Sequence, residues 1–347
     1  MLSSKQILEI REHLENSRNP VFFFDNDPDG LCSFLLLQRF IGRGRGVIIK
    51  SFPGLNASYF HRVEEFQADC IFVLDKPIID EEFIELADKA GIPLIHIDHH
   101  DVARAEKIKN HYNTYHESKL NEPTSYLCYK VAERKEDEWI AAIGCISDGF
   151  IPEFMADLKK SYPELIEINY KSAFDIRYCT EFGKIARAIS FSLKDKTTNV
   201  ISMMRFLMKA KNIQDLLEDN KNTKAIWQRY EEINLKYQRL MKKAEEEYNS
   251  KDNLLFFSYS GDMSISQYIA DELLFKHPRK IIVVAYTKGN IANVSLRWEK
   301  DIRVPVVKAI ASIEGATGGG HRNSCGARIP ADRLVEFLNI LKSEIKN

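Results

Sequence analysis

Residues 21–30 read VFFFDNDPDG, an apolar run that changes abruptly into three carboxylates and a glycine. The run VFFF has the composition of a buried β-strand, which we predict at residues 21–24. Asp25, Asp27 and Asp29 follow it at alternate positions. In an extended chain these side chains share one face, where like charges need a cation. In an Asx-rich turn they would instead lead into the next helix and favour its start, so this stretch alone leaves both interpretations open.

The same order of apolar strand, polar break and helical pattern continues through the first 150 residues. We predict further strands at residues 47–52, 71–74 and 94–97, with helices at residues 31–40 and 81–90 between them. This alternation predicts a parallel α/β sheet. Functional sites in such sheets lie beyond the carboxyl ends of the strands.

Acidic residues and histidines follow the later apolar stretches too. A fourth such stretch, AAIGCISDG, also ends in an acid, and we interpret it as another strand end. Each acid alone fits a loop or a helix cap, but their recurrence at successive strand ends favours a site for manganese or a similar divalent ion. The residues concerned are Asp75, Asp98, His99, His100 and Asp148.

Helical patterns dominate from residue 152 to residue 250, and strand patterns return after residue 251. Apolar residues from Ile226 to Tyr248 recur at steps of three and four, which predicts one long helix in the core or between domains; a partner-binding coiled coil is the alternative. Strands are predicted at residues 254–259, 280–285 and 291–296, followed by helices. We therefore predict three parts: residues 1–155, a helical connector at 156–250, and a second α/β domain at 251–347.

The composition is that of an ordinary globular protein, with 44% hydrophobic and 29% charged residues in 347. No apolar run has the ~20 residues of a membrane span, and the start of the chain lacks the apolar core of a signal peptide, so we expect a cytoplasmic protein without membrane contact. Six cysteines without a CxxC pair predict buried thiols. Residues 251–347 hold 14 Lys and Arg against 10 Asp and Glu, which favours a polyanionic ligand there.

The ordered motifs resemble those of the DHH phosphoesterase superfamily, and the glycine-rich stretch near the C-terminus resembles the signature of the associated DHHA1 domain. The resemblance implies an N-terminal parallel-sheet DHH domain, a helical connector and a smaller C-terminal α/β DHHA1 domain. The residues that carry it are Asp25-x-Asp27-x-Asp29-Gly30, Asp75, Asp98-His99-His100, Asp148 and Gly318-Gly319-Gly320-His321, with Cys325-Gly326-Ala327 after them.

The resemblance also implies two divalent ions, with manganese expected and magnesium as the alternative. Asp98 would orient or buffer the neighbouring histidine, and His100 would contact the scissile phosphate. Many small-nucleotide members have a histidine where this chain has Phe23, and the DxDxDG spelling is closer to RecJ-like than to NrnA-like members. The implied ligands are Asp25 and Asp27 for one ion, Asp29, His99 and Asp148 for the other, and Asp75 as the bridge.

In the second domain, the resemblance implies that the loop formed by Gly318, Gly319, Gly320 and His321 holds the substrate. Glycines let backbone N–H groups approach a phosphate closely. Arg297, at the end of a predicted strand, resembles the phosphate-binding arginine of the family; an ion pair with Glu299 or Asp301 is the alternative.

These features predict an exonuclease that releases mononucleotides from single-stranded DNA or RNA, or from short oligonucleotides. Two alternatives stay open. One is a phosphatase or phosphodiesterase for small nucleotides such as 3′-phosphoadenosine 5′-phosphate or cyclic dinucleotides. The other is a non-catalytic replication subunit of the Cdc45 kind, although the chain retains the full ligand set. A replication or repair partner, or a homodimer, is compatible with the long helix.

Overall fold

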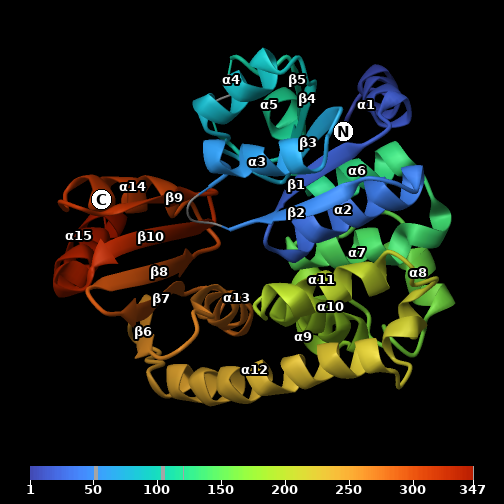
Figure 1. Cartoon of the computed structure of the whole chain (residues 1–347). Coiled ribbons are helices and arrows are strands. Elements are labelled where there is room, and N and C mark those ends of the chain that lie inside the picture. Colours follow the sequence, from blue (N-terminus) through green and yellow to red (C-terminus); the bar gives the residue numbers. More distant parts are fainter. Residues whose placement is uncertain (51–53, 103–105, 120, 347) are drawn as a thin grey trace. The chain divides into compact units, whose positions relative to one another are not determined.

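The computed structural model describes residues 1–50, 54–102, 106–119 and 121–346, and these form two compact units, Met1–Tyr230 and Glu231–Asn347 (Figure 1). The first unit contains a parallel sheet of order β2-β1-β3-β4-β5. This sheet confirms the predicted α/β class. Its strands are β1 (Pro20–Asp25), β2 (Arg45–Ile49), β3 (Cys70–Leu74), β4 (Leu94–Asp98) and β5 (Asn110–Asn113).

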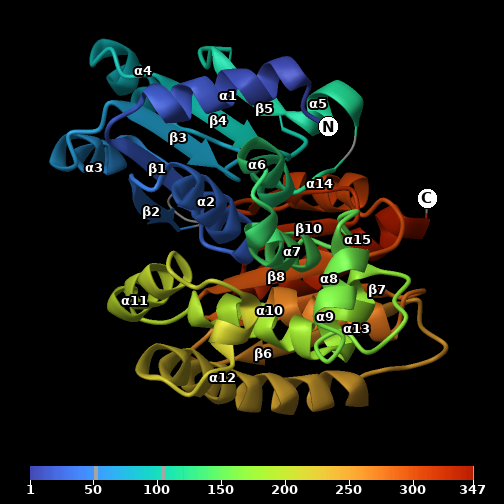
Figure 2. The same cartoon turned by 90° about the vertical axis from the view of Figure 1, so that its right-hand side faces the viewer.

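Helices cover both faces of this sheet (Figures 1 and 2). Phe23 points to one face, where its ring meets the edge of Phe83 in α4 (Glu81–Lys89) at 5.4 Å between centroids. Phe22 and Phe24 point to the other face and pack on Phe34 of α2 (Pro28–Ile41). Successive residues of β1 are thus buried on opposite sides, which explains why the strand reads as an unbroken apolar run.

The remaining helices of the first unit surround this sheet or extend from it. α3 (Phe60–Glu65) adds Phe60 and Val63 to the core on the α4 side, and α2 packs on α6 and α7 on the other. The bounds of the others are α1 (Ser4–Asn16), α5 (Thr114–Ser118), α6 (Thr124–Ala132), α7 (Glu138–Ser147), α8 (Met155–Ser161), α9 (Ala173–Cys179), α10 (Glu181–Ser192) and α11 (Thr197–Leu207).

One predicted strand end is in fact a helix end. Residues 141–149, AAIGCISDG, lie in α7 and its C-terminus, so Asp148 follows a helix. The helix is buried from Trp139 to Ile146. An uninterrupted apolar run does not distinguish a buried strand from a buried helix, which is why the prediction of a strand here was wrong.

The second unit is built on a mixed sheet of order β6-β7-β8-β10-β9. β6 pairs with β7 in parallel, and the other pairs are antiparallel. Side chains of α14 and α15 pack on one face of the sheet, whereas Ser266 of α13 bonds Ser295 of β8 at 2.9 Å. The bounds are β6 (Leu254–Ser260), α13 (Ser266–Lys276), β7 (Ile281–Lys288), β8 (Ile291–Arg297), α14 (Arg303–Ala311), β9 (Thr317–Gly320), β10 (Ser324–Pro330) and α15 (Leu334–Lys346).

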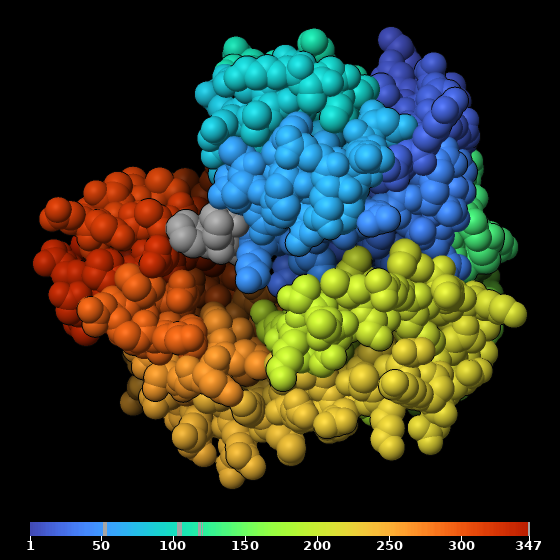
Figure 3. Space-filling model, in the orientation of Figure 1, coloured from blue at the N-terminus to red at the C-terminus, as the bar shows by residue number. Residues whose placement is uncertain are grey.

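The boundary between the two units falls inside the predicted long helix, α12 (Lys221–Glu246). Ile226, Ile233 and Ala244 of its apolar stripe are buried, while Tyr248 is exposed. Charged residues of α12 such as Glu232, Lys236 and Lys243 are exposed. The helix forms part of the surface drawn in gold in Figure 3. The stripe is thus largely a packing surface within the chain.

Among the described residues, no helix combines the length and the apolar character that crossing a bilayer requires.

Candidate metal centre

The carboxylates after β1 lie in a tight turn rather than in a continued strand. β1 ends at Asp25, and Asp27 caps α2 by accepting the backbone N–H of Gly30 at 2.9 Å. A Cβ at Gly30 would lie 2.6 Å from the backbone oxygen of Asp25, so the turn requires glycine there. The turn therefore brings Asp25, Asp27 and Asp29 to the carboxyl end of the sheet without extended geometry.

Asp29 is fixed by the N-terminus of α6. Its carboxylate accepts the backbone N–H groups of Thr124 at 2.8 Å and Ser125 at 2.9 Å, and also the Ser125 hydroxyl. The side chain is buried, and burial together with the charge of Asp148 raises its pKa despite these bonds. A cation beside Asp29 would remove this electrostatic cost.

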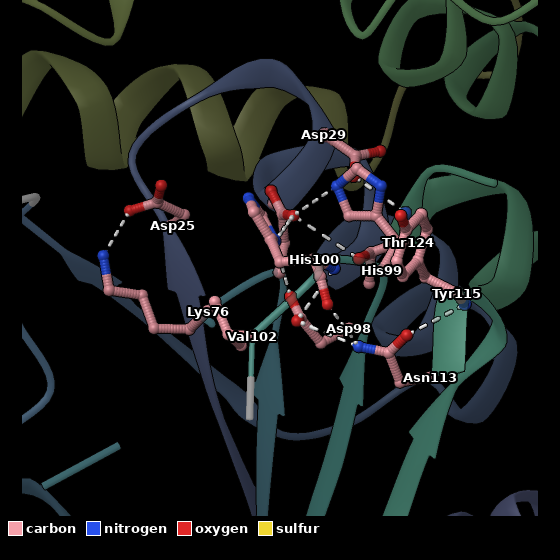
Figure 4. Close-up of polar contacts among 12 residues, drawn as sticks. Asp25, Asp29, Lys76, Asp98, His99, His100, Val102, Asn113, Tyr115 and Thr124 are labelled. Atoms are coloured by element: carbon pink, nitrogen blue, oxygen red, sulfur yellow. Dashed lines mark hydrogen bonds and ion pairs between the residues drawn. The ribbon is translucent and has the colours of Figure 1, made fainter. Parts of the chain in front are cut away.

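His99 is the point at which the carboxylates converge (Figure 4). Its Nε2 atom lies 3.3 Å from Asp75 Oδ1, 3.5 Å from Asp148 Oδ2 and 3.9 Å from Asp29 Oδ2. Its Nδ1 atom donates to Asn121 Oδ1 at 2.8 Å, so in the neutral ring Nε2 carries the lone pair. The ring is held in the tautomer that a metal ligand needs.

Asp98 is committed to His100. The fully buried Asp98 carboxylate accepts the backbone N–H of His100 at 3.1 Å and its Nδ1–H at 2.9 Å. Burial alone would lower the pKa of His100, but the Asp98 charge and this hydrogen bond raise it to about 9. Burial alone would raise the pKa of Asp98, but the charge of His100 keeps it well below its usual range. At neutral pH the pair is an imidazolium and a carboxylate.

Asp75 and Asp27 carry the strongest signs of crowded negative charge. Burial, followed by the charges of neighbouring aspartates, raises the pKa of Asp75 well above its usual range. The same two causes raise the pKa of Asp27 to about 7. Asp75 also adopts φ +56°, a conformation that is uncommon outside glycine and is often retained at functional sites.

Asp25 has a partner that the sequence analysis did not single out. Lys76 Nζ lies 2.8 Å from Asp25 Oδ1, and the Lys76 side chain is 8% exposed. Asn121, which holds His99, was missed in the same way, as were Thr124 and Ser125, which hold Asp29. All but Lys76, which follows Asp75 directly, lie far along the chain from the motifs, and none has a spacing that would reveal its role.

Two sets of side chains bring their ligand atoms within 4.8 Å of one another in the part of the chain that the structure describes. Imidazole nitrogen among hard carboxylate oxygens is a donor set that suits manganese and similar divalent ions. The raised pKa values of Asp29 and Asp75 agree with a site built around a cation. The sets are Asp75 with His99 and His100, and Asp29 with His99 and Asp148. His100 already donates its Nδ1–H to Asp98, so we do not count it among the ligands.

The predicted substrate residues of the second unit lie at one edge of its sheet. Gly318, Gly319 and Gly320 lie in the edge strand β9, which pairs with β10, instead of in the expected loop. Glycine is required at 318 and 320, because Cβ atoms there would collide with the backbone of β10. His321 follows in the turn, where its N–H bonds Ser324 O at 2.8 Å. Arg297 pairs with Asp271, at 2.6 Å from its Nε, rather than with Glu299 or Asp301.

Two family models match the chain: the DHH family N-terminal domain at residues 21–155 and the DHHA1 domain at residues 252–347. No curated protein sequence matches it.

Several solved structures share its fold at low sequence identity. RecJ from Thermus thermophilus in complex with Mn²⁺ has TM-score 0.70 and 14% identity, covering 99% of this chain and 54% of that one. A DHH-domain protein described as a member of the s1p family of ribosomal proteins has TM-score 0.69 and 16% identity, covering 98% and 89%. The pGpG-specific phosphodiesterase PggH from Vibrio cholerae has TM-score 0.52 and 11% identity, covering 94% and 100%. With the ordered motifs and their convergence at His99, these matches assign the chain to the DHH family of phosphoesterases, with an N-terminal DHH domain and a C-terminal DHHA1 domain.

Proposed function

We propose that the chain is a divalent-metal-dependent phosphodiesterase, an exonuclease that releases mononucleotides from single-stranded DNA or RNA or from short oligonucleotides. The observation that carries this proposal is His99, whose Nε2 lone pair faces the carboxylates of Asp75 and Asp148 at 3.3 and 3.5 Å. Membership of the DHH family supplies the class of bond, and the DxDxDG spelling and the basic second domain favour a nucleic acid over other phosphoesters.

Manganese is the ion that we expect, with magnesium as the alternative, and the T. thermophilus RecJ of the same fold was solved with Mn²⁺. When bound, such an ion polarises a phosphoryl oxygen and lowers the pKa of water toward neutrality. The sequence resemblance implies two ions. One of them would be held by Asp29, Asp75, His99 and Asp148.

His100 is the residue that we assign to the scissile phosphate. Its bond to Asp98 fixes the ring, and a pKa of about 9 keeps it cationic at neutral pH. A fixed imidazolium stabilises negative charge that develops on the phosphate. Asp98 acts through His100 and is a positioning residue.

Arg297, the glycines of β9 and His321 are the substrate contacts that we propose in the second unit. A guanidinium has five N–H donors and can bind phosphate. In Arg297, Nε contacts Asp271 and Nη1 donates to Leu296 O at 3.0 Å and Cys325 O at 3.4 Å, so Nη2 is the group that we assign to the phosphate. A Cβ at Gly319 would meet nothing within 4 Å, so there is space beside this glycine for a phosphate.

A small-nucleotide phosphodiesterase is the second candidate, and the fold likeness to PggH supports it. The two candidates differ in the length of substrate that they accept. Hydrolysis of oligomers of about ten nucleotides favours the exonuclease, whereas cleavage limited to dinucleotides or 3′-phosphoadenosine 5′-phosphate favours the alternative. The non-catalytic Cdc45-like role is disfavoured, because the aspartates and His99 that such a subunit would lack are present and converge.

The decisive variant is Asp75→Asn. It keeps the shape of the side chain but removes a charge beside His99, so we expect hydrolysis to fall at least about a thousandfold in the presence of Mn²⁺, with an unchanged circular dichroism spectrum. Asp88→Asn, on an exposed position of α4, is the matched control and should keep full activity. End-labelled DNA and RNA oligomers of graded length, with Mn²⁺ or with chelator, provide the assay. Unaltered turnover in Asp75→Asn would refute the site.

A further inference from the structure

Lys76 stands where the sequence resemblance puts the first of two metal ions. Its Nζ atom is 2.8 Å from Asp25 Oδ1, and both side chains are largely withdrawn from water, at 8% and 23% exposure. Figure 4 shows Lys76 reaching Asp25 on one side of the cluster, with His99 and Asp29 on the other. Asp25, which the resemblance assigns to the first ion, thus already forms an ion pair with Lys76.

The backbone fixes Lys76 in this position. Asp75 turns the chain at φ +56°, and its N–H is bonded to Ile97 O at 3.0 Å. The carbonyl oxygen of Lys76 accepts Nε2–H from the buried His96 at 2.8 Å. Both ends of the turn are thus bonded to β4. These two hydrogen bonds fix the backbone of Lys76 and therefore the direction in which its side chain leaves the chain.

While Lys76 occupies Asp25, the other groups around the first position do not complete a set of ligands for a second divalent ion. Phe23, where many small-nucleotide relatives have a histidine, is fully buried against Phe83 and supplies no donor. Asp27 uses its Oδ1 atom to cap α2 through the N–H of Gly30, which leaves Oδ2 as its one remaining ligand atom. Neither Asp25 nor Asp27 belongs to a set of converging ligand atoms among the described residues.

We propose that the Lys76 ammonium takes the place of the first divalent ion, so that the centre works with one bound metal ion and one built-in cation. The ion would occupy the set formed by Asp29, Asp75, His99 and Asp148, and the lysine would compensate Asp25 and present its remaining N–H donors to a phosphate oxygen. An ammonium is a compact point charge suited to both tasks. This inference rests on the proposed metal-dependent function but concerns the number of ions, which is measured without turnover.

The test is the stoichiometry of Mn²⁺ binding to the full chain, by isothermal titration calorimetry and by electron paramagnetic resonance. The wild type should bind one ion per chain and give the hyperfine pattern of an isolated Mn²⁺. Lys76→Met, of similar length and without charge, should bind a second ion and give the broadened spectrum of a coupled pair. Lys76→Arg should keep one ion. Lys107→Met removes a lysine that pairs with Glu85 at 2.9 Å on the surface and is the control, also with one ion.

The number of Mn²⁺ ions bound by the wild type and by Lys76→Met decides whether the lysine replaces the first ion. A wild type with two coupled ions overturns the inference while leaving the proposed phosphodiesterase intact. A Lys76→Met protein that folds, judged by circular dichroism, and still binds one ion overturns it as well. If Lys76→Met does not fold, Lys76→Gln, which can still bond Asp25, takes its place under the same criteria. A wild type that hydrolyses nothing and binds no Mn²⁺ refutes the proposed function itself, and the inference falls with it.

Discussion

At the scale of single residues, the proposed binding of a metal ion by His99 depends on which ring nitrogen carries the proton. The hydrogen bond to Asn121 places the proton of the neutral ring on Nδ1, and Nε2 faces three carboxylates. The order of acids and histidines could be read from the sequence, because each follows a recognisable apolar stretch. The partner of His99 could not, because Asn121 is one polar residue in an irregular segment without a motif.

Asn121→Ala should weaken Mn²⁺ binding by about 10- to 100-fold, because loss of the partner lets the ring rotate or take the other tautomer. Calorimetric titration measures this. Asn121→Asp keeps an oxygen acceptor for Nδ1–H and should bind within a few fold of the wild type. Equal affinities in Asn121→Ala and the wild type would mean that His99 is oriented by other contacts.

At the scale of secondary-structure elements, the turn between β1 and α2 sets the position of three carboxylates. It depends on the absence of a side chain at Gly30, where a Cβ would lie 2.6 Å from Asp25 O and 2.8 Å from Asp25 N. Both obstacles are backbone atoms, so a larger residue has to move the strand or the helix. The sequence left the turn and the metal site as alternatives; the structure has the turn, and the turn places Asp29 among the ligand atoms that converge near His99.

Gly30→Ala should lower the free energy of unfolding by about 1–3 kcal/mol and reduce Mn²⁺ affinity, because α2 and Asp29 are displaced together. Chemical denaturation and calorimetric titration measure the two effects. Gly54→Ala is the matched control, since a Cβ there would meet no atom within 4 Å. If both variants behave alike, the close approach at Gly30 is not what holds the turn.

Asp69 joins the segment after α1 to the start of β3, and its contribution depends on pH. Burial opposes the change, but bonds from the Ser17 hydroxyl at 2.7 Å and from the backbone N–H groups of Arg18 and Asn19 lower the pKa of Asp69. A carboxyl with a depressed folded pKa stabilises the protein above its unfolded pKa, about 3.9, and loses this effect as the pH falls through the folded value.

The variant Asp69→Asn should therefore be less stable than the wild type at pH ~7, and the difference should vanish below about pH 3. The side chain is exposed, so water screens the interaction and the difference should stay below about 1 kcal/mol. Denaturation midpoints of the two proteins across this pH range measure it. A gap that stays constant down to low pH would show that packing, and not charge, is responsible.

Two strands of the second unit that the sequence did not predict, β9 and β10, share a physical cause. β9 is a run of glycines without apolar alternation, and β10 alternates the small residues Cys325 and Ala327 with polar ones, so neither has the bulk that marks a strand. β10 pairs with β8, and β9 pairs with β10, and no local pattern encodes either pairing. The strands β1, β3, β4 and β7 were predicted because their residues are mostly apolar, as burial on both faces requires.

At the scale of the whole molecule, the candidate functional residues are distributed over two units that share α12. Tyr230 stacks on Phe191 in the first unit at 5.8 Å between centroids, and Tyr237 bonds Glu272 in the second. The predicted stripe therefore belongs to two cores in succession, which favours the interpretation as an inter-domain helix. The candidate metal centre lies in one unit, and the basic surplus and Arg297 lie in the other.

If the second unit binds the substrate, changing Arg297 should alter binding without altering the chemical step. We expect Arg297→Ala to raise KM for an oligonucleotide about 10- to 100-fold, the range for losing a hydrogen bond to a charged group, and to change kcat by less than about threefold. Steady-state kinetics with an oligomer measure both constants. Arg297→Lys keeps the charge but lacks the planar guanidinium, so its KM should lie between those of the wild type and Arg297→Ala.

Arg297 also pairs with Asp271, so a rise in KM has to be separated from damage to the fold. Asp271→Asn breaks the same ion pair and leaves the guanidinium in place. If Arg297 binds phosphate, Asp271→Asn keeps the wild-type KM, because only the pair is lost. If the arginine serves only to hold α13 against β8, both variants should raise KM equally and lose thermal stability together, and the second unit would then need another group to bind the substrate.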